Sequence, residues 1–552
     1  MNLLAGLAAL GGPGPTTTTT SVPACTVHPS GQVTNLCTKA GSLHLAFQYN
    51  YVAPELILIG GALVILMVSA LLPKRQIRRL WMWMTVVTGV VSLAWSAWLW
   101  HGQFPKHAGL IVGNALVFDQ FTVFFAVLIS VAVVLSALVS DSYLRREGLD
   151  GPEFYVLALL SASGGMIMAA ANDLIVIFLG LEILSIALYI MTAYHRRRIE
   201  SGEASMKYFI LGAFSSAIFL YGAALCYGAT GSTRLSEIAT FLAQTHVPKS
   251  ILLAGVVLLI VGLGFKVAAV PFHTWTPDVY QGAPTPATGF MAAVAKAGGF
   301  AALIRVLVGT FGTMSVDWRP VIWVLAALTL LVGSVLAIVQ TDIKRMLAYS
   351  SISHAGYVLV GVQAADSTGT AGALFYLFSY LFLVIGSFAI VAVVSGRGEA
   401  RNDLGSLRGL ASRRPALAFS FVVLLLAQAG VPFTTGFFAK FYVVAAAVGQ
   451  HQYVLAVLAM LAAAIAAFFY LRVAILMYSP LPEAGDGGAG SGAGAAPAVL
   501  GGVALAAPPE TGQVVVPWTV AAALVICVAF TIIFGVYPTP LIHFAKHAVL
   551  LF

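Results

Sequence analysis

One feature constrains the fold more than any other: apolar runs of helix-spanning length recur along the whole chain. A run of roughly 20 residues crosses a hydrocarbon layer as a helix. Helices are expected because unpaired backbone groups cannot face lipid, and a β-barrel would show short alternating segments instead. The composition agrees, since 60% of the 552 residues are hydrophobic and 9% are charged, against about 25% charged in soluble domains. We therefore predict an all-α, polytopic membrane protein.

The hydropathy pattern predicts about 14 transmembrane helices. Their expected limits are 54–72, 80–100, 119–140, 152–171, 174–193, 204–226, 250–282, 285–308, 320–339, 344–363, 371–395, 415–449, 452–477 and 516–538.

The net charge of +8 does not indicate nucleic-acid binding, because the basic residues occupy short loops between predicted spans. Alternate loops hold 16 lysines and arginines on one side, and the other side holds six. Cytoplasmic loops carry the excess of basic residues. The sequence thus predicts a multi-pass protein lying in a lipid bilayer with both termini exterior.

The predicted spans divide the chain into segments. We expect residues 1–50 to form an extended exterior tail, and residues 479–515, rich in Gly and Ala, to form a flexible loop. Between them lie spans 1–3 (51–150), spans 4–8 (151–310) and spans 9–13 (311–478), and residues 516–552 hold span 14 and the C-terminus. Cys25 and Cys37 could pair if the tail is exported, but no other feature supports a disulfide.

Two spans, 250–282 and 415–449, are unusually long, and each is interrupted by proline. Proline removes a backbone donor and breaks a helix. The breaks have similar sequences, "AVPFHT" at 269–274 and "GVPFTT" at 430–435. In the predicted topology the two spans cross the membrane in opposite directions. Discontinuous helices at matching places are typical of inverted repeats. We therefore predict an inverted-topology repeat, with one discontinuous helix in each half.

Ionisable residues inside the predicted spans are the candidate functional residues, because a charge at the bilayer centre costs about 2.5–3.5 kcal/mol. Glu182, Lys266 and Lys296 lie near the middle of their spans. Satisfaction by a neighbouring polar group is the structural alternative for Glu182. Neither lysine can easily reach an interface, which favours a functional role for both.

Four further residues are candidates with stronger structural alternatives. Lys440 lies in the outer half of its span and Lys207 at the start of span 6, so either could extend to the headgroups. His273 and His354 lie deep in the membrane and could relay protons or simply hydrogen-bond to a carbonyl.

Arg305 and Arg472 lie near span ends and are interpreted as interfacial anchors. No spacing typical of a metal or cofactor site occurs in the sequence. What remains is one buried acid and several buried amines on different helices. Burial lowers a lysine pKa and a nearby carboxylate raises it again, so such a row of groups, joined by water at the broken helices, predicts a path for protons.

The motifs "GLEILSIALYIM", "EASMKYFILGAFSSAIFLYG", "DIKRMLAYSSISHAGYVLVG" and "GVPFTTGFFAKFYV" resemble those of the antiporter-like membrane subunits of respiratory complex I, from about residue 50 to 475. Within that group the chain is most similar to the subunit N branch of NADH-quinone oxidoreductase. "EASMKYFILGAFSSA" is typical of that branch, Lys440 stands where subunit M usually has glutamate, and no long lateral helix of the subunit L kind follows span 14.

The resemblance implies a proton-translocating subunit of a bacterial plasma (inner) membrane, with electron transfer to quinone in other subunits. It also implies a core of two inverted five-helix repeats, spans 4–8 at 151–310 and spans 9–13 at 311–478. It implies a Glu182–Lys266 pair, a further family lysine at Lys207, a central lysine at Lys296 and a lysine of the second broken helix at Lys440. His354 falls in the matching "SISHAGY" motif.

The same resemblance implies that the chain itself holds no cofactor, and that NADH, FMN, Fe–S clusters and quinone belong to partner subunits. The implied partners are the antiporter-like subunit M and the small subunits K and J.

Two other functions stay open at this level. A subunit of a multisubunit cation/proton antiporter would share most of the motifs, although no buried acid cluster suited to sodium is visible. A purely structural membrane subunit would leave the deep charges without a role.

Overall fold

The computed structural model describes residues 49–71, 79–102, 108–244, 249–480, 515–548 and 550. The tail predicted at 1–50 lies outside these residues apart from its last two positions, as do Cys25, Cys37 and most of the 479–515 loop.

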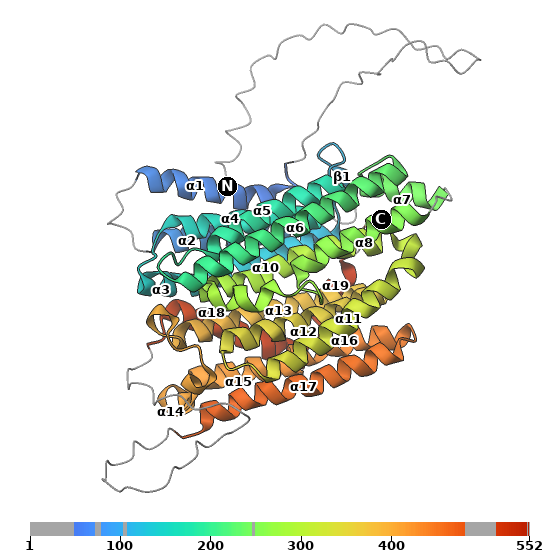
Figure 1. The fold of residues 1–552 in the computed structure, drawn as a ribbon. Coiled ribbons are helices and arrows are strands. Elements are labelled where there is room, and N and C mark those ends of the chain that lie inside the picture. The colour runs from blue at the N-terminus through green and yellow to red at the C-terminus, as the bar shows by residue number, and fades with distance from the viewer. Residues whose placement is uncertain are drawn as a thin grey trace, which may run out of the picture. The chain divides into compact units, whose positions relative to one another are not determined.

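Long helices packed side by side make up the described part of the chain (Figure 1). The unbroken long helices are α1 (Ala53–Leu71), α2 (Leu80–Gly102), α3 (Gln120–Glu147), α4 (Pro152–Ala170), α5 (Leu174–Thr192), α6 (Ile199–Thr230), α10 (Thr285–Ile304), α11 (Ser315–Ile338), α12 (Ile343–Gln363), α13 (Ser367–Val394), α17 (Tyr453–Tyr478) and α18 (Trp518–Val536).

Both predicted broken spans are discontinuous. The first consists of α8 (Lys249–Val267) and α9 (Trp275–Gly282), and the second of α15 (Pro415–Ala429) and α16 (Thr435–Gly449). Within the described residues, 12 helices are long and apolar enough to cross a membrane. Adding α12 and the α15–α16 pair gives the 14 predicted spans, so the all-α polytopic class is confirmed.

Short elements lie between the spans and after the last one. They are the strands β1 (Gly109–Ile111) and β2 (Leu116–Phe118), the helices α7 (Leu235–Gln244), α14 (Leu410–Arg413) and α19 (Thr539–His547), the π-helix η1 (Arg305–Thr310), and three 3₁₀ turns: η2 (Gly312–Met314), η3 (Arg397–Glu399) and η4 (Leu404–Leu407). The antiparallel β1–β2 hairpin was not predicted.

Two identical backbone crossings show the internal repeat directly. Leu174 N–H donates to Thr233 O at 2.9 Å and Leu235 N–H donates to Asn172 O at 2.7 Å. In the second half, Ile343 N–H donates to Asn402 O at 2.7 Å and Leu404 N–H donates to Thr341 O at 2.8 Å. All four positions are shifted by the same 169 residues. Helices α5 and α12 therefore begin in equivalent surroundings.

The two crossings lie at opposite ends of the helices, as an inverted repeat requires. The first lies at the end that carries β1 and α7 (Figure 1). The second lies at the end that we call the basic face, where Arg145, Arg198, Lys344 and the 397–414 segment gather.

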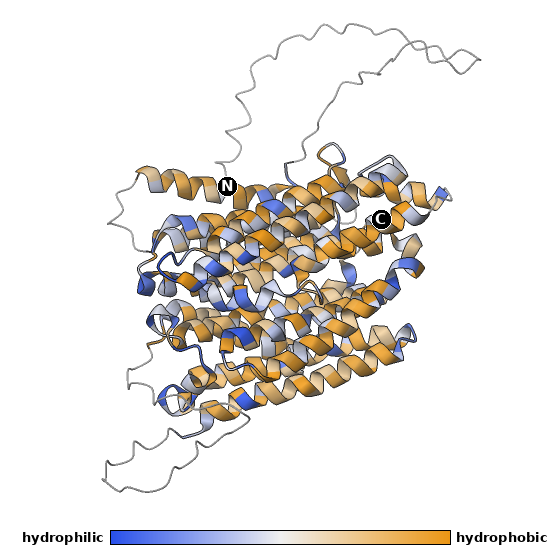
Figure 2. Ribbon diagram, in the orientation of Figure 1, coloured by the Kyte–Doolittle hydropathy of each residue, from blue (hydrophilic) through white to orange (hydrophobic). Residues whose placement is uncertain are grey.

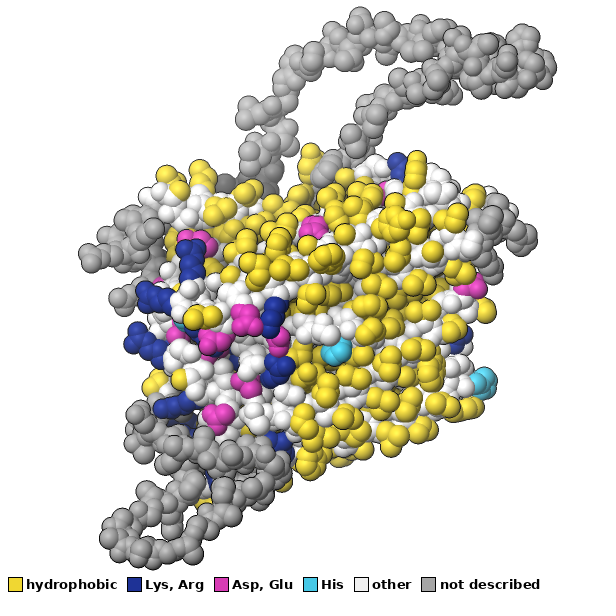
Figure 3. All heavy atoms as spheres, in the orientation of Figure 1, with side chains coloured by type: hydrophobic (Ala, Val, Ile, Leu, Met, Phe, Trp, Pro, Cys, Tyr) yellow, Lys and Arg dark blue, Asp and Glu magenta, His cyan; other side chains and the backbone are white. Residues whose placement is uncertain are grey.

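The outer surface matches a lipid environment. Figure 2 shows hydrophobic residues along the helices, with hydrophilic segments gathered towards the basic face. In Figure 3 a broad hydrophobic side meets a patch of Lys, Arg, Asp and Glu at that end. Large apolar side chains stay exposed on the outer helices, for example Phe214 on α6 at 68%. The apolar exterior places the polar chemistry inside the bundle and at its ends.

Candidate functional site

Lys266 lies in the last turn of α8, just before the break, and is buried. Its ammonium donates to Tyr208 Oη at 3.4 Å. It also lies 5.1 Å from the ring of Tyr208 and 5.6 Å from the ring of Tyr189. Tyrosine rings attract a cation through their negative faces, so aromatic rings supply most of the neighbourhood of this amine.

Glu182 lies on α5 and is half-buried. Its Oε1 atom is buried and has no hydrogen-bond partner in the described part of the chain. The carboxylate interacts electrostatically with Lys266, although the two side chains form no ion pair within the described residues. The implied pair is therefore near in space but unbonded here.

Lys296 lies on α10, and the same helix packs against Lys266. A Cβ atom added at Gly299, three residues after Lys296, would lie 3.5 Å from Lys266 Cβ. The Lys296 ammonium donates to the carbonyl of Ser351 on α12 and lies 5.8 Å from the ring of Tyr380. Helix α10 thus joins the first lysine to the second repeat.

His354 on α12 connects two tyrosines. Its Nδ1 atom lies 2.6 Å from Tyr376 Oη and its Nε2 atom lies 3.1 Å from Tyr470 Oη. The histidine is also within electrostatic range of both Lys296 and Lys440. It therefore lies between the central lysine and the second broken helix.

Lys440 does not extend to the headgroups, contrary to the alternative that its position allowed. It is 7% exposed, and its ammonium donates to Ala429 O at 2.8 Å, across the break between α15 and α16. The ammonium lies 4.9 Å from the ring of Tyr357, which stacks on Tyr376 with centroids 5.7 Å apart. The second break thus places a lysine on a free helix-end carbonyl.

The other two predicted residues lie off this row. Lys207 does not open its helix, because α6 begins at Ile199. Its side chain is 43% exposed at the basic face and pairs with Glu203 at 2.7 Å and Asp278 at 2.8 Å. His273 lies in the turn before α9, and its Nδ1 atom is buried without a hydrogen-bond partner in the described residues.

The structure brings Glu182, Lys266, Lys296, His354 and Lys440 into one row across the bundle. We call these five residues the buried axis. Among its surrounding hydroxyls, Ser351 Oγ and Tyr380 Oη are buried and have no hydrogen-bond partner in the described residues. Buried polar atoms of this kind are usually paired by ordered water.

A second buried cluster, centred on Glu399, was missed by sequence reasoning. This carboxylate accepts from Arg198 at 2.6 Å, Lys344 at 2.8 Å and Tyr143 Oη at 2.7 Å. The N–H and hydroxyl of Thr285 also donate to it, at 2.8 and 2.6 Å. Burial alone would raise the pKa of Glu399, but the charges of Lys344 and Arg198 hold it well below the usual range.

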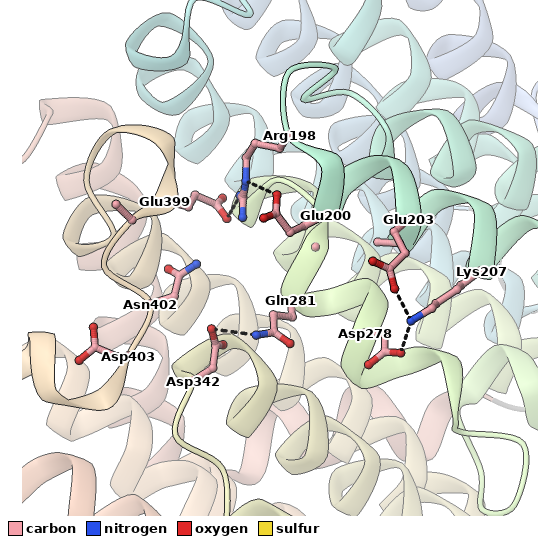
Figure 4. A pocket seen from close by; sticks show the side chains of 13 residues that line it. Arg198, Glu200, Glu203, Lys207, Asp278, Gln281, Asp342, Glu399, Asn402 and Asp403 are labelled. Atoms are coloured by element: carbon pink, nitrogen blue, oxygen red, sulfur yellow. Dashed lines mark hydrogen bonds and ion pairs between the residues drawn. The ribbon is translucent and has the colours of Figure 1, made fainter. Parts of the chain in front are cut away.

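A cleft of about 450 Å³ opens beside this cluster at the basic face. Figure 4 shows Glu203 and Asp278 pointing at Lys207, and Gln281 pointing at Asp342. Burial raises the pKa of Asp342, which faces the cleft from the start of α12. The only signal for this site in the sequence was a run of mixed charges in loops.

Arg305 is not an interfacial anchor, so that interpretation is wrong. Its side chain is fully buried and forms a two-pronged ion pair with Asp119, with both nitrogen–oxygen distances at 3.0 Å. Its Nε–H also donates to Ala169 O at 2.7 Å. Arg472 does lie near a helix end, donating to Ile338 O at 2.8 Å.

Comparison with known proteins agrees with this architecture. Residues 171–466 match the family described as NADH:quinone oxidoreductase/Mrp antiporter, transmembrane. NADH-quinone oxidoreductase subunit N of Trichlorobacter lovleyi is 41% identical over 501 residues, covering 91% of this chain and 96% of the relative. The subunit N of a Parafrankia species is 44% identical over 461 residues, covering 80% and 87%.

Solved structures extend the likeness to three dimensions. A chain of respiratory complex I from Thermus thermophilus with bound aureothin superimposes with a TM-score of 0.71 at 30% identity, covering 89% of this chain and 98% of that one. A chain of the Mrp complex from Dietzia has a TM-score of 0.77 at 21% identity, covering 90% and 96%, which shows a shared fold. With this sequence likeness over almost the whole length of its relatives, the chain belongs to the NADH-quinone oxidoreductase subunit N family of antiporter-like membrane proteins.

Proposed function

We propose that this chain is a proton-translocating subunit in the membrane arm of an NADH:quinone oxidoreductase. The observation that carries the proposal is the buried axis, in which three lysines lie on different helices with sparse polar partners. Amines held this way can change protonation state with little rearrangement. Membrane-embedded ionisable groups typically mark ion paths and proton relays.

Each residue of the buried axis has a distinct role in the proposal. A change of charge or hydration driven by electron transfer in other subunits reaches Glu182 and alters its interaction with Lys266. Lys266 then releases its proton towards Lys296. His354, with the hydroxyls of Tyr376 and Tyr470 on its two nitrogens, carries it on to Lys440 and the exterior.

The energy scale fits such a path. Moving one charge against the membrane potential requires about 2.3 kcal/mol per 100 mV. One pKa unit corresponds to about 1.4 kcal/mol. A shift of a few units at one lysine, produced by moving a neighbouring carboxylate, is therefore enough to drive transfer.

Lys207 and His273 take different places in this proposal. Lys207 lies at the basic face, where it can transfer protons between the cleft and the buried axis. His273 lies beside the first break, and its unpaired ring nitrogen can accept a proton there.

Family membership supports the wider part of this proposal. The chain itself carries no redox centre in this proposal, and NADH, FMN, Fe–S clusters and quinone belong to partner subunits. We place it in a bacterial inner membrane beside the antiporter-like subunit M and the small subunits K and J. The basic face is then cytoplasmic, and both termini are exterior.

The test is proton yield per electron in inside-out membrane vesicles carrying K266A. We expect NADH-driven electron transfer to continue with a strongly reduced yield. K546A, which removes an exposed lysine of α19, is the matched control and should leave the yield unchanged. Undiminished yield in K266A would refute the role of the axis.

A cation/proton antiporter subunit is the alternative function. Sodium flux through the isolated, reconstituted chain would support it over the proposal. Loss of assembly, with unchanged yield per electron in the assembled complexes, would favour a purely structural role.

A further inference from the structure

The short helix α9 connects the basic face with the first lysine of the buried axis. It has eight residues and lies between the break that follows Lys266 and the start of α10. Trp275 stands at its first position and Asp278 one turn later. Residues three apart lie on the same side of a helix. Because α9 is short, a shift at Asp278 therefore also displaces Trp275.

At the basic face, Asp278 joins the two repeats. It accepts from Lys207 of α6 at 2.8 Å and from Arg345 of α12 at 2.6 Å. Arg345 also donates to Gln281 Oε1 at 3.1 Å, and Gln281 donates to Asp342 at 3.3 Å. Helix α9 is thereby held from both sides by charge-assisted bonds, which are about twice as strong as neutral ones.

At its inner end, α9 shapes the surroundings of Lys266. Trp275 Nε1–H donates to Phe265 O at 3.0 Å, the carbonyl directly before Lys266. The indole stacks on Tyr208 with centroids 4.5 Å apart and planes at 11°. Tyr208 is also the hydroxyl that accepts from Lys266. The Trp275 side chain therefore holds both the backbone next to Lys266 and the Tyr208 hydroxyl that accepts from Lys266.

We propose that Asp278 and Trp275 are positioning residues for Lys266. The ion pairs that Asp278 makes to the two repeats hold α9, and Trp275 passes this placement to the Lys266 backbone and to Tyr208. A relative movement of the repeats at the basic face thus changes how Lys266 meets its acceptor. This inference rests on the proposed proton-transfer role of Lys266 and deepens it.

The geometry makes the effect selective. Neither Asp278 nor Trp275 contacts the Lys296, His354 or Lys440 side chains through any hydrogen bond in the described residues. A misplacement of about 1 Å can slow a transfer step by up to about 100-fold. Disturbing α9 should therefore slow the first transfer and leave the later relay intact.

The experiment compares D278N, D278E and W275F in the assembled complex, measuring the proton yield per electron at matched electron-transfer rates. Because the first transfer is slowed, we expect D278N to lower this yield by up to about tenfold, and D278E, which keeps the charge, to recover most of it. W275F keeps the stacked ring but loses the indole N–H, so its effect should be intermediate.

The conservative variant separates positioning from simple structural support. A structural role would lower the amount of assembled complex in D278N and leave the yield per electron of what assembles unchanged, and that result would overturn the proposal. If D278N does not assemble, W275F decides the matter, since an unchanged yield in assembled W275F also overturns it.

K266A in the same strain separates this inference from the proposed function. Normal proton yield in K266A would contradict both the proposed function and this inference. If proton yield is lost in K266A but normal in D278N and W275F, only the inference about Asp278 and Trp275 is contradicted.

Discussion

The cluster around Glu399 and the surroundings of Lys266 are both buried and charged, yet they are partnered in opposite ways. Glu399 accepts hydrogen bonds from Arg198, Lys344, Tyr143 and Thr285, all within 2.8 Å. Among the described residues, Lys266 donates to one acceptor, Tyr208 Oη at 3.4 Å, and its ammonium lies near the rings of Tyr189 and Tyr208.

The difference separates structural charges from mobile ones. A carboxylate with a full set of donors is fixed in its ionised form, because neutralising it would leave its buried cations unpaired. A lysine with one long hydrogen bond loses little when it gives up its proton. The same residue types therefore hold the repeats together at the basic face and carry protons in the axis.

The largest expected effect is at Lys266 itself. K266M keeps the length of the side chain and removes its charge, so we expect proton yield per electron to fall close to zero while the melting temperature of the purified complex stays the same or rises. Burying a single ion carries a large desolvation cost, and Lys266 forms no ion pair within the described residues that would offset it. A lowered melting temperature with normal yield would reverse the assignment of the two regions.

E399Q should lower stability and leave proton yield unchanged, the opposite of K266M. Removing one partner of a buried charge network costs about 3–5 kcal/mol of stability, because Lys344 and Arg198 lose their counter-charge. We expect a clearly lower melting temperature and unchanged proton yield in the complex that assembles. Altered yield without loss of stability would place Glu399 among the proton-carrying residues.

The pH dependence of this stability has a defined sign. The pKa of Glu399 lies well below its usual range in the folded protein, so its stabilisation is fully present above the ordinary glutamate pKa of about 4.3. It is lost as the pH falls below that value towards the folded pKa. The difference in melting temperature between wild type and E399Q should be constant from about pH 5 to about pH 7. It should become smaller in more acid buffer.

Two tyrosine variants test the role of the hydroxyl group beside Lys266 and beside Lys440. Y208F removes the only hydrogen-bond acceptor of Lys266 in the described residues and should slow proton transfer several-fold. Y357F keeps the ring near Lys440 and loses a 2.7 Å bond to Ala459 O, which should cost about 1 kcal/mol of stability and little yield. Unchanged yield in Y208F would mean that the ring of Tyr208, and not its hydroxyl, matters at Lys266.

Much of this architecture could be predicted from the sequence, because the membrane makes hydrophobicity and charge unusually informative. The spans, the two proline breaks and the deep lysines all follow from local patterns. The Glu399 cluster does not, since "SGRGEARND" reads as a solvated loop and its burial depends on contacts with residues up to 256 positions away. Arg305 was misassigned for the same reason, because only the distant Asp119 shows that it is paired inside.

The remaining predictions concern the two breaks, where left-handed backbone occurs on different residue types. Gly430 has a φ of 91°, and a Cβ atom there would lie 2.9 Å from Lys440 Cδ, whereas Ala268 adopts a φ of 63° without being glycine. G430A should cost about 1–2 kcal/mol of stability and also lower proton yield by pushing Lys440 from the Ala429 carbonyl. A268G removes similar strain but adds about 0.5–1 kcal/mol of chain entropy in the unfolded state, so its melting temperature should rise only slightly and its yield stay normal. Loss of yield in A268G would mean that the rigidity of the first break, and not only the place of its lysine, matters for transfer.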